Sequence, residues 1–249
     1  MSIVLAAAAA FAAAAAACFL RWRLWFLPSH KRNLVMITSA LRVPAEFTVF
    51  SVEQRFDQLL VSVRSARESV PDAVIVVLEQ GVFTGFQMGR LRTEGVMYIK
   101  QYGKDEVVGL THHIKSKGEL YMLRAYLESR EFARLRPHLQ TVSKLSGRYW
   151  LTPQFRFDVI PLEYPLFKEG SWNDYNSEIY ETRYYRIKVD YVDTFVWHLN
   201  RMEEDPTEDS VEPRFFRHRV FGEAARGIVE PFKLHVAGYI APTGEYVED

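Results

Sequence analysis

The sequence predicts an α/β domain, a mixed β-sheet flanked by helices, with an apolar helix at the N-terminus. Two short apolar runs, 33–38 and 73–78, are separated by a segment with helical spacing of its apolar residues. A strand, a helix and a strand within about fifty residues are typical of a parallel sheet. An alanine-rich run, 3–20, precedes these elements and has the composition of a separate helix.

Composition narrows the class of protein. The 249 residues are 48% hydrophobic, which is enough for one sizeable core. The 31 basic and 31 acidic residues cancel, and this balance argues against a nucleic-acid binder, which usually carries a basic excess. Cys18 is the single cysteine, so an intrachain disulfide, a cysteine-based zinc site and thiol catalysis in the domain are excluded. Aromatic residues make up 14% of the chain. Such a content is typical of a large core and also of proteins that bind carbohydrates on aromatic side chains, and the core is the favoured interpretation.

Residues 1–28 are expected to be a membrane-anchor or signal segment, and 33–249 the folded domain. The apolar run is just long enough to span a bilayer, and tryptophans beside arginines at 21–25 suit its interface. No basic residue precedes the run and four follow it within twelve residues, which predicts an anchor through 3–27 with the domain in the cytosol. A cleaved signal peptide and a soluble alanine helix stay open as alternatives.

The first half of the domain is predicted from apolar patterns. The run 33–38 forms a buried strand, and 51–69 forms a helix in which Ser51 and Gln54 make a capping box. The run 73–78 forms the second strand. Ligands of open α/β sheets bind beyond the carboxyl ends of the strands, where Thr38, Ser39 and Glu79 lie.

The second half follows the same logic. A third strand is expected at 96–99, an amphipathic helix at 117–136, and a strand at 141–150 that runs into a Ser-Gly-Arg turn. Beyond it the sequence predicts a strand at 178–189, a helix at 190–202, an exposed acidic loop at 203–212, and a strand at 234–239 followed by a turn.

Two runs place cations and small residues at the edges of these elements: Lys115-Ser116-Lys117-Gly118-Glu119 and Lys144-Leu145-Ser146-Gly147-Arg148-Tyr149-Trp150. Glycine lets the backbone approach closely and Lys or Arg supplies charge, so both runs suit a phosphate-bearing ligand. The alternative is that Lys144 and Arg148 are surface cations and Gly147 a turn residue. Arg55, in the helix after the first strand, reaches either a nucleotide phosphate or a neighbouring carboxylate.

An ordered set of motifs adds a resemblance. Ser51 to Phe56 leads a helix, and Val-Pro-Asp-Ala-Val-Ile-Val-Val-Leu-Glu, Lys-Gly-Glu, Lys-Leu-Ser-Gly-Arg-Tyr, Thr-Arg-Tyr-Tyr and Gly-Tyr-Ile-Ala-Pro-Thr-Gly-Glu follow in that order. From about residue 33 onward the chain resembles small glycosyltransferase-like proteins of large algal DNA viruses and some bacteria. The resemblance implies a GT-A-like fold, a nucleotide-sugar donor, transfer of a hexosyl or pentosyl group, and a glycan or glycoprotein acceptor. The donor-binding residues are then expected to be Thr38, Ser39, Arg55, Lys117, Lys144, Ser146 and Gly147.

The metal site of that fold class has no counterpart at the expected place. Most GT-A enzymes hold the donor diphosphate through a divalent metal on an Asp-x-Asp motif, and here the corresponding strand ends in Ser146-Gly147-Arg148. Arg148 is therefore expected to neutralise the leaving diphosphate directly. No metal or other cofactor is expected, although a divalent metal stays open. His112 and His113 are adjacent and would point to opposite faces of an extended segment, which argues against a metal site there.

The catalytic base is left open. An inverting transferase needs a carboxylate that deprotonates the acceptor hydroxyl, and the candidates are Glu79, Asp158, Glu181 and Asp190. His235 and Glu245 are expected on the acceptor side, a core histidine being the alternative for His235. No Gly-x-Ser-x-Gly, Walker or Gly-x-Gly-x-x-Gly motif is present, which excludes the hydrolases, NTPases and dehydrogenases that use them. A non-catalytic nucleotide- or glycan-binding protein on the same fold is the alternative function.

Overall fold

The computed structural model describes residues 32–103, 115–172, 177–205, 211–221 and 233–248. The expected anchor segment and the pair His112-His113 lie outside these ranges. Within them, no helix has both the length and the apolar character needed to cross a bilayer.

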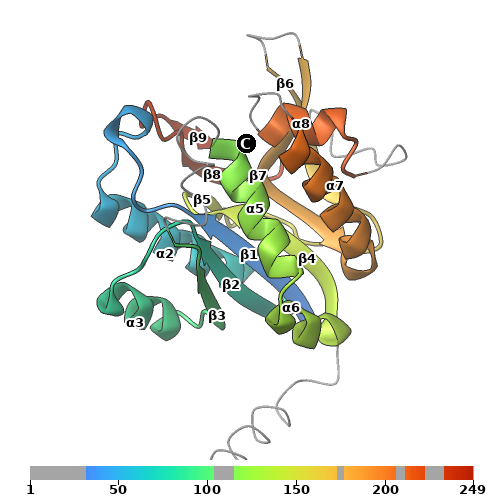
Figure 1. Ribbon diagram of the computed structural model, residues 1–249, viewed down its shortest axis with the longest axis horizontal. Coiled ribbons are helices and arrows are strands. Elements are labelled where there is room, and N and C mark those ends of the chain that lie inside the picture. Colours follow the sequence, from blue (N-terminus) through green and yellow to red (C-terminus); the bar gives the residue numbers. More distant parts are fainter. Residues whose placement is uncertain (1–31, 104–114, 173–176, 206–210, 222–232, 249) are drawn as a thin grey trace, which may run out of the picture. The chain divides into compact units, whose positions relative to one another are not determined.

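A six-stranded sheet forms the centre of the domain (Figure 1). Its strands lie in the order β3-β2-β1-β4-β7-β6. The first four are parallel: β1 (Arg32–Ser39), β2 (Ala73–Glu79), β3 (Tyr98–Gln101) and β4 (Leu139–Ser146). The last two, β7 (Ser177–Lys188) and β6 (Leu166–Trp172), run antiparallel to their neighbours. The predicted mixed sheet flanked by helices is thus confirmed.

The strand order creates a switch point between β1 and β4. From β1 the chain moves outward through β2 to β3, and then returns to place β4 on the other side of β1. The carboxyl ends of β1 and β4 therefore lie side by side at the point where the strand order reverses, and open α/β sheets bind their ligands at such a point.

Helices cover both faces of this sheet. They are α2 (Val52–Ser69), α3 (Gly85–Thr93), α5 (Lys115–Leu127), α6 (Arg130–Leu135), α7 (Val192–Glu204) and α8 (Val211–Arg217), with 3-10 turns η1 (Ala45–Phe47), η2 (Arg136–His138) and η3 (Val189–Tyr191). The predicted capping box at the start of α2 is confirmed, since Ser51 N donates to Gln54 Oε1 at 2.8 Å and Gln54 N donates to Ser51 Oγ at 3.2 Å.

Alternate residues of β1 and β2 enter two separate cores. Leu34, Met36, Val74 and Val76 pack with residues of α5, α6 and α7, whereas Val35, Ile37, Ile75 and Val77 pack with α2. Because both faces of these strands are covered, each reads as a continuous apolar run, which explains why they were predictable.

A second sheet was not predicted. It contains β5 (Tyr149–Leu151), β8 (Val236–Tyr239) and β9 (Tyr246–Glu248), all antiparallel. The single strand predicted at 141–150 is in fact divided at Gly147, so that its first part belongs to the large sheet and its last part to the small one.

The other predicted elements agree in type and differ at their ends. The helix predicted at 117–136 is two helices, because Ser129 caps the second by accepting the N–H of Phe132 at 3.2 Å. Elements α3, β6, α8 and β9 were not predicted. At the two ends of the loop expected at 203–212, α7 extends to Glu204 and α8 begins at Val211.

Candidate functional site

The carboxyl ends of β1 and β4 are held together tightly. Thr38 and Ser146 are paired, and Gly147 N donates to Thr38 O at 2.7 Å. A Cβ atom on Gly147 would lie 2.8 Å from that oxygen and 3.1 Å from a methyl carbon of Leu59. The structure therefore brings Thr38, Ser39, Ser146 and Gly147 together at the switch point, and Gly147 is needed there for close packing.

Lys144 does not lie at the surface. Its side chain has no exposed area, and its ammonium group forms an ion pair with the carboxylate of Glu119. Lys144 Nζ also donates to Ser146 Oγ at 2.7 Å and to the carbonyl oxygen of Thr182 at 2.5 Å. These three partners take up the three protons of the ammonium group, so the surface-cation alternative is wrong for Lys144.

Glu119 is the carboxylate that this arrangement orients. It lies near the start of α5, and its Oε1 both faces Lys144 and accepts a hydrogen bond from Thr38 Oγ1 at 3.1 Å. Its side chain keeps 23% of its area exposed. Glu119 was quoted within a sequence motif but was not predicted as a site residue. The sequence could have indicated this role, because Glu119 is a carboxylate near the start of a predicted helix and lies two residues after Lys117.

Arg148 follows Gly147 directly and is half-buried. Its guanidinium carbon lies 5.5 Å from the centre of the Tyr149 ring, and Arg183 approaches the same ring at 5.4 Å. The Nε atom of Arg148 is buried, and it has no hydrogen-bond partner within the described part of the chain. Leaving a buried donor unsatisfied costs about 1–3 kcal/mol. The Nε atoms of Arg32 and Arg186 also have no partner among the described residues, so Arg148 is distinguished by its position after Gly147, at the carboxyl end of β4.

Arg55 adds positive charge nearby. Burial, and next the repulsion of Arg148, lower the pKa of Arg55 to about 10, with Glu79 opposing them. The Arg55 guanidinium donates to Ala40 O at 2.8 Å and to Thr48 Oγ1 at 3.1 Å, so it also holds the segment after β1. Two guanidinium groups thus lie near enough to repel each other at the switch point.

Glu79, at the end of β2, is only 1% exposed. Its Oε1 accepts from Leu41 N at 2.9 Å and from Gly81 N at 3.1 Å. Burial raises the pKa of this carboxyl group, while the hydrogen bonds to it oppose the shift. The contacts of Glu79 are those of a group that fixes the loops after β1 and β2.

The remaining predicted carboxylates differ in their relation to Arg148. Glu181, on β7, lies 3.7 Å from Arg183 Nε and 3.8 Å from Lys168 Nζ, and Arg183 shares the Tyr149 ring with Arg148. Asp158 is exposed and lies 3.7 Å from the exposed Arg156. Asp190 follows the end of β7 that pairs with the start of β4, so it lies at the opposite end of the sheet.

Two predicted acceptor-side residues belong to the small sheet, and Lys117 belongs to α5. His235 precedes β8 with a φ of 57°, and its carbonyl oxygen accepts the N–H of Thr152 at 3.0 Å. Glu245 is exposed before β9, and its carbonyl oxygen accepts the N–H of Ile240 at 2.9 Å. Lys117 is half-buried in the first turn of α5.

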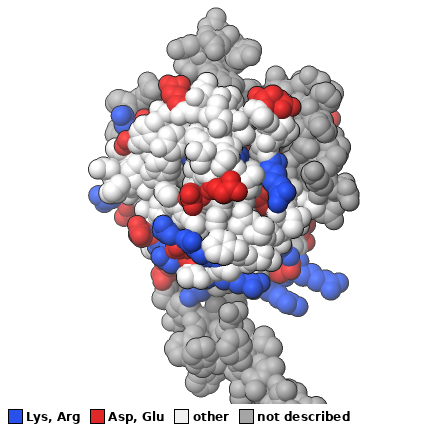
Figure 2. All heavy atoms as spheres, turned by 90° about the vertical axis from the view of Figure 1, so that its left-hand side faces the viewer, with Lys and Arg blue, Asp and Glu red and all other residues white. Residues whose placement is uncertain are grey.

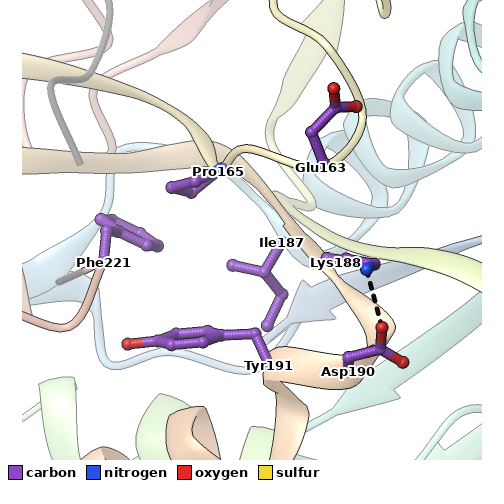
Figure 3. A pocket seen from close by; sticks show the side chains of 7 residues that line it. All are labelled: Glu163, Pro165, Ile187, Lys188, Asp190, Tyr191 and Phe221. Carbon is purple, nitrogen blue, oxygen red and sulfur yellow. Dashed lines mark ion pairs between the residues drawn. The ribbon is translucent and has the colours of Figure 1, made fainter. Parts of the chain in front are cut away.

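A pocket of about 260 Å³ lies at the other end of the large sheet (Figure 3). An ion pair at 2.8 Å between Lys188 and Asp190 borders it, and the Tyr191 hydroxyl donates to Val220 O at 2.8 Å. Its lining residues are Glu163, Pro165, Ile187, Lys188, Asp190, Tyr191 and Phe221. This pocket contains none of the predicted donor-binding residues. Across the described ranges, no three His, Cys, Asp or Glu side chains are grouped so as to hold a metal ion.

Comparison with known proteins finds similarity among solved structures alone. No protein-family model matches the chain, and no curated protein does. Among solved structures, the chain is similar to the glycosyltransferase GlyE of Streptococcus pneumoniae, with 10% sequence identity and a TM-score of 0.48. The similarity covers 80% of this chain and 45% of that chain, so the chain spans less than half the length of GlyE.

Proposed function

We propose that this protein is a glycosyltransferase that moves a sugar from a nucleotide-sugar donor to a glycan acceptor, with the donor at the switch point between β1 and β4. One observation carries the proposal. Arg148 lies at that switch point beside a glycine, with a buried Nε that has no partner among the described residues. A guanidinium group with an unused donor, at the place where α/β sheets bind ligands, suits the diphosphate of such a donor.

Arg148 would act on the leaving group. As the bond between the sugar and the diphosphate breaks, negative charge grows on the β-phosphate, and a guanidinium group already in place stabilises it. Arg55, whose pKa Arg148 helps to lower, adds to the same positive field. Ser39, Gly147 and Lys117 are proposed to line the donor site with their backbone or side chains.

Glu119 would bind a hydroxyl group of the donor. Lys144 and Thr38 both contact its Oε1, so its other oxygen remains able to accept a hydrogen bond from a ligand. Lys144 and Thr38 are then positioning residues, because they act through Glu119. Among the predicted bases, Glu181 is favoured because it lies near Arg148. Glu181 is 3.7 Å from Arg183 Nε, and Arg183 and Arg148 both approach the ring of Tyr149.

The membrane is proposed as the place of action. The apolar run through 3–27 would anchor the chain, with the domain in the cytosol. Flotation of the full-length protein with lipid vesicles tests the anchor, and the proposal fails if the protein stays at the bottom of the gradient.

The deciding experiment is a donor-hydrolysis assay with the full-length protein over a panel of nucleotide sugars, with and without EDTA. We expect one nucleotide sugar to be hydrolysed slowly without acceptor, and UDP or GDP to raise the melting temperature when EDTA is present. Loss of both effects in EDTA would show that a metal carries the diphosphate. Nucleotide binding without hydrolysis or transfer would instead identify a non-catalytic binding protein.

A further inference from the structure

The small sheet carries an aromatic face. Trp150 is paired with Ala237, and Tyr239 with Tyr246, so these side chains project from the same side of the sheet. The ring centres of Trp150 and Tyr239 are 5.7 Å apart, those of Trp150 and Tyr246 are 6.1 Å apart, and those of Tyr239 and Tyr246 are 5.8 Å apart. The planes of these pairs lie at 56°, 39° and 67° to each other, and Phe50 packs on Tyr239 with ring centres 5.6 Å apart, so the rings form an aromatic cluster on this side of the sheet.

This face is not needed for the core. The opposite face of the small sheet carries Tyr149, Leu151 and Val236, which are buried in the cluster that packs against α2. On the aromatic face, Tyr246 is 50% exposed, and Trp150 and Tyr239 are half-buried. β9 lies on the left-hand side in Figure 1, and the corresponding side view shows uncharged residues over much of its upper part (Figure 2).

The chemistry of the three rings favours a sugar. Each ring combines an apolar face with one polar group, and Tyr246 OH donates to Glu248 Oε2 at 2.9 Å. The C–H groups on one face of a sugar ring are slightly positive and pack on the negative face of an aromatic ring, while the hydroxyl groups around the sugar need polar partners at its edge. Rings with a hydrogen-bonded carboxylate at their border meet both requirements.

The position of this face indicates which sugar it would bind. Arg148 immediately precedes β5, and Trp150 lies two residues further along the same strand. Two residues of a strand span about 7 Å, so the aromatic face begins within the length of one or two sugar units from the proposed point of transfer. The Arg148 guanidinium approaches the Tyr149 ring, on the opposite face of β5 from Trp150, so a glycan on the rings would reach the donor around the start of this strand.

We propose that Trp150, Tyr239 and Tyr246 form a stacking platform that binds a sugar ring of the acceptor glycan. That the bound glycan is the acceptor rests on the proposed function, whereas binding of a glycan by the platform does not. The predicted acceptor-side residues His235 and Glu245 flank the same strands, one before β8 and one before β9.

The test is binding of purified oligosaccharides to the full-length protein, without any donor. An oligosaccharide array identifies the best probe, and titration then measures its Kd for the wild type and for variants. We expect Tyr246→Ala and Trp150→Ala to weaken binding about tenfold each, because each removes one stacking ring, and Tyr246→Phe to retain most of the affinity. Trp197→Ala is the matched control, since Trp197 is a 52% exposed tryptophan on α7, away from the small sheet.

The outcomes separate this inference from the proposed function. If Tyr246→Ala and Trp150→Ala bind the probe as the wild type does, or if no oligosaccharide binds, the platform is wrong even where the wild type hydrolyses a donor. If both variants lose the probe while the wild type hydrolyses no donor, the platform stands and the transferase fails. A dimer that dissociates in Tyr246→Ala, without sugar binding in the wild type, would make the face a protein interface and overturn the inference. Melting curves identify a variant that has not folded, and Tyr246 on the edge strand β9 is the safer of the two positions.

Discussion

Two buried cations lie on adjacent strands, Lys144 on β4 and Arg186 on β7, and they bind different kinds of partner. Neither has any exposed area. Arg186 contacts the carbonyl oxygen of Phe157 and donates to those of Ile160, Pro161 and Tyr164 at 2.8, 3.1 and 3.3 Å. Lys144 instead meets a carboxylate, a hydroxyl group and a single carbonyl group.

This difference separates a cation that shapes the backbone from one that orients a functional group. The four carbonyl groups around Arg186 all come from the segment that leads into β6, so this guanidinium holds a loop in place. Lys144 holds Glu119, whose carboxylate remains partly exposed at the switch point. Changes at Arg186 should therefore affect stability alone, and changes around Lys144 should affect stability and ligand binding together.

The largest effect is expected for Arg186→Met. The substitution leaves several buried carbonyl groups without a donor and should lower the free energy of unfolding by about 3–5 kcal/mol. Denaturant unfolding followed by circular dichroism measures it. Arg156→Met is the control, since Arg156 has 75% of its side chain exposed and its ion pair with Asp158 should contribute less than about 1 kcal/mol. Equal losses in the two variants would remove the role assigned to Arg186.

Arg148 supplies the strongest contrast in activity. Arg148→Ala should slow sugar transfer about a hundredfold, because one charge-assisted contact to a developing anion is worth about 3 kcal/mol. Arg148→Lys should recover only part of the rate, since an ammonium group cannot reproduce the two-pronged contact of a guanidinium. Turnover and melting temperature are measured on the same samples. Unchanged transfer by a folded Arg148→Ala protein would sink the assignment.

The ion pair of Lys144 and Glu119 should respond asymmetrically. Glu119→Gln leaves a fully buried ammonium group without its counter-charge and should cost about 2–3 kcal/mol of stability. Lys144→Met leaves a carboxylate that still reaches water, so about 1 kcal/mol is expected. The double variant should regain part of the loss, and a double-mutant cycle of unfolding free energies measures the coupling. Additive losses would mean that the two charges do not depend on each other.

The smallest effect concerns Glu79 and pH. Burial raises the pKa of its carboxyl group in the folded protein, so the folded state binds this proton more tightly than the unfolded chain does. The contribution of Glu79 to stability is therefore full below the unfolded pKa and is lost as the pH rises through the folded pKa. Glu79→Gln should remove this loss, so that its stability changes less than that of the wild type between acidic and neutral pH. Parallel pH profiles of the two proteins would contradict the assignment.

How far the sequence could predict these regions depends on burial. The apolar runs of β1 and β2 identified central strands, and the rule that ligands bind beyond strand ends placed Thr38, Ser39 and Arg148 at one edge. The environment of Lys144 was not predictable, because a lysine in a strand is usually exposed and its partner Glu119 comes from a helix that folds over β1. Glu79 was expected to face a ligand, and only the structure shows that the loops after β1 and β2 cover it.

The failure to predict β6, β9 and the small sheet also has physical reasons. β6 is an edge strand that contains Lys168, Glu169 and Gly170, so it shows neither an apolar run nor a clear alternation. β9 has three residues, which is too short for a periodic pattern. The small sheet as a whole depends on pairing Tyr149 with Gly238, a contact across almost ninety positions that no local pattern encodes.

Gly147 has a consequence for the range of sequences this domain can tolerate. A side chain there would collide with a backbone oxygen, which cannot move without separating β1 from β4, whereas nothing lies within 4 Å of a Cβ added to Gly85 or Gly89. In a library of variants at every glycine, we expect almost no folded protein with a substitution at 147 and many with a substitution in α3. Alanine at 89 would stabilise that helix by about 0.5–1 kcal/mol. Any diversification of the segment that ends β4 must therefore hold Gly147 constant.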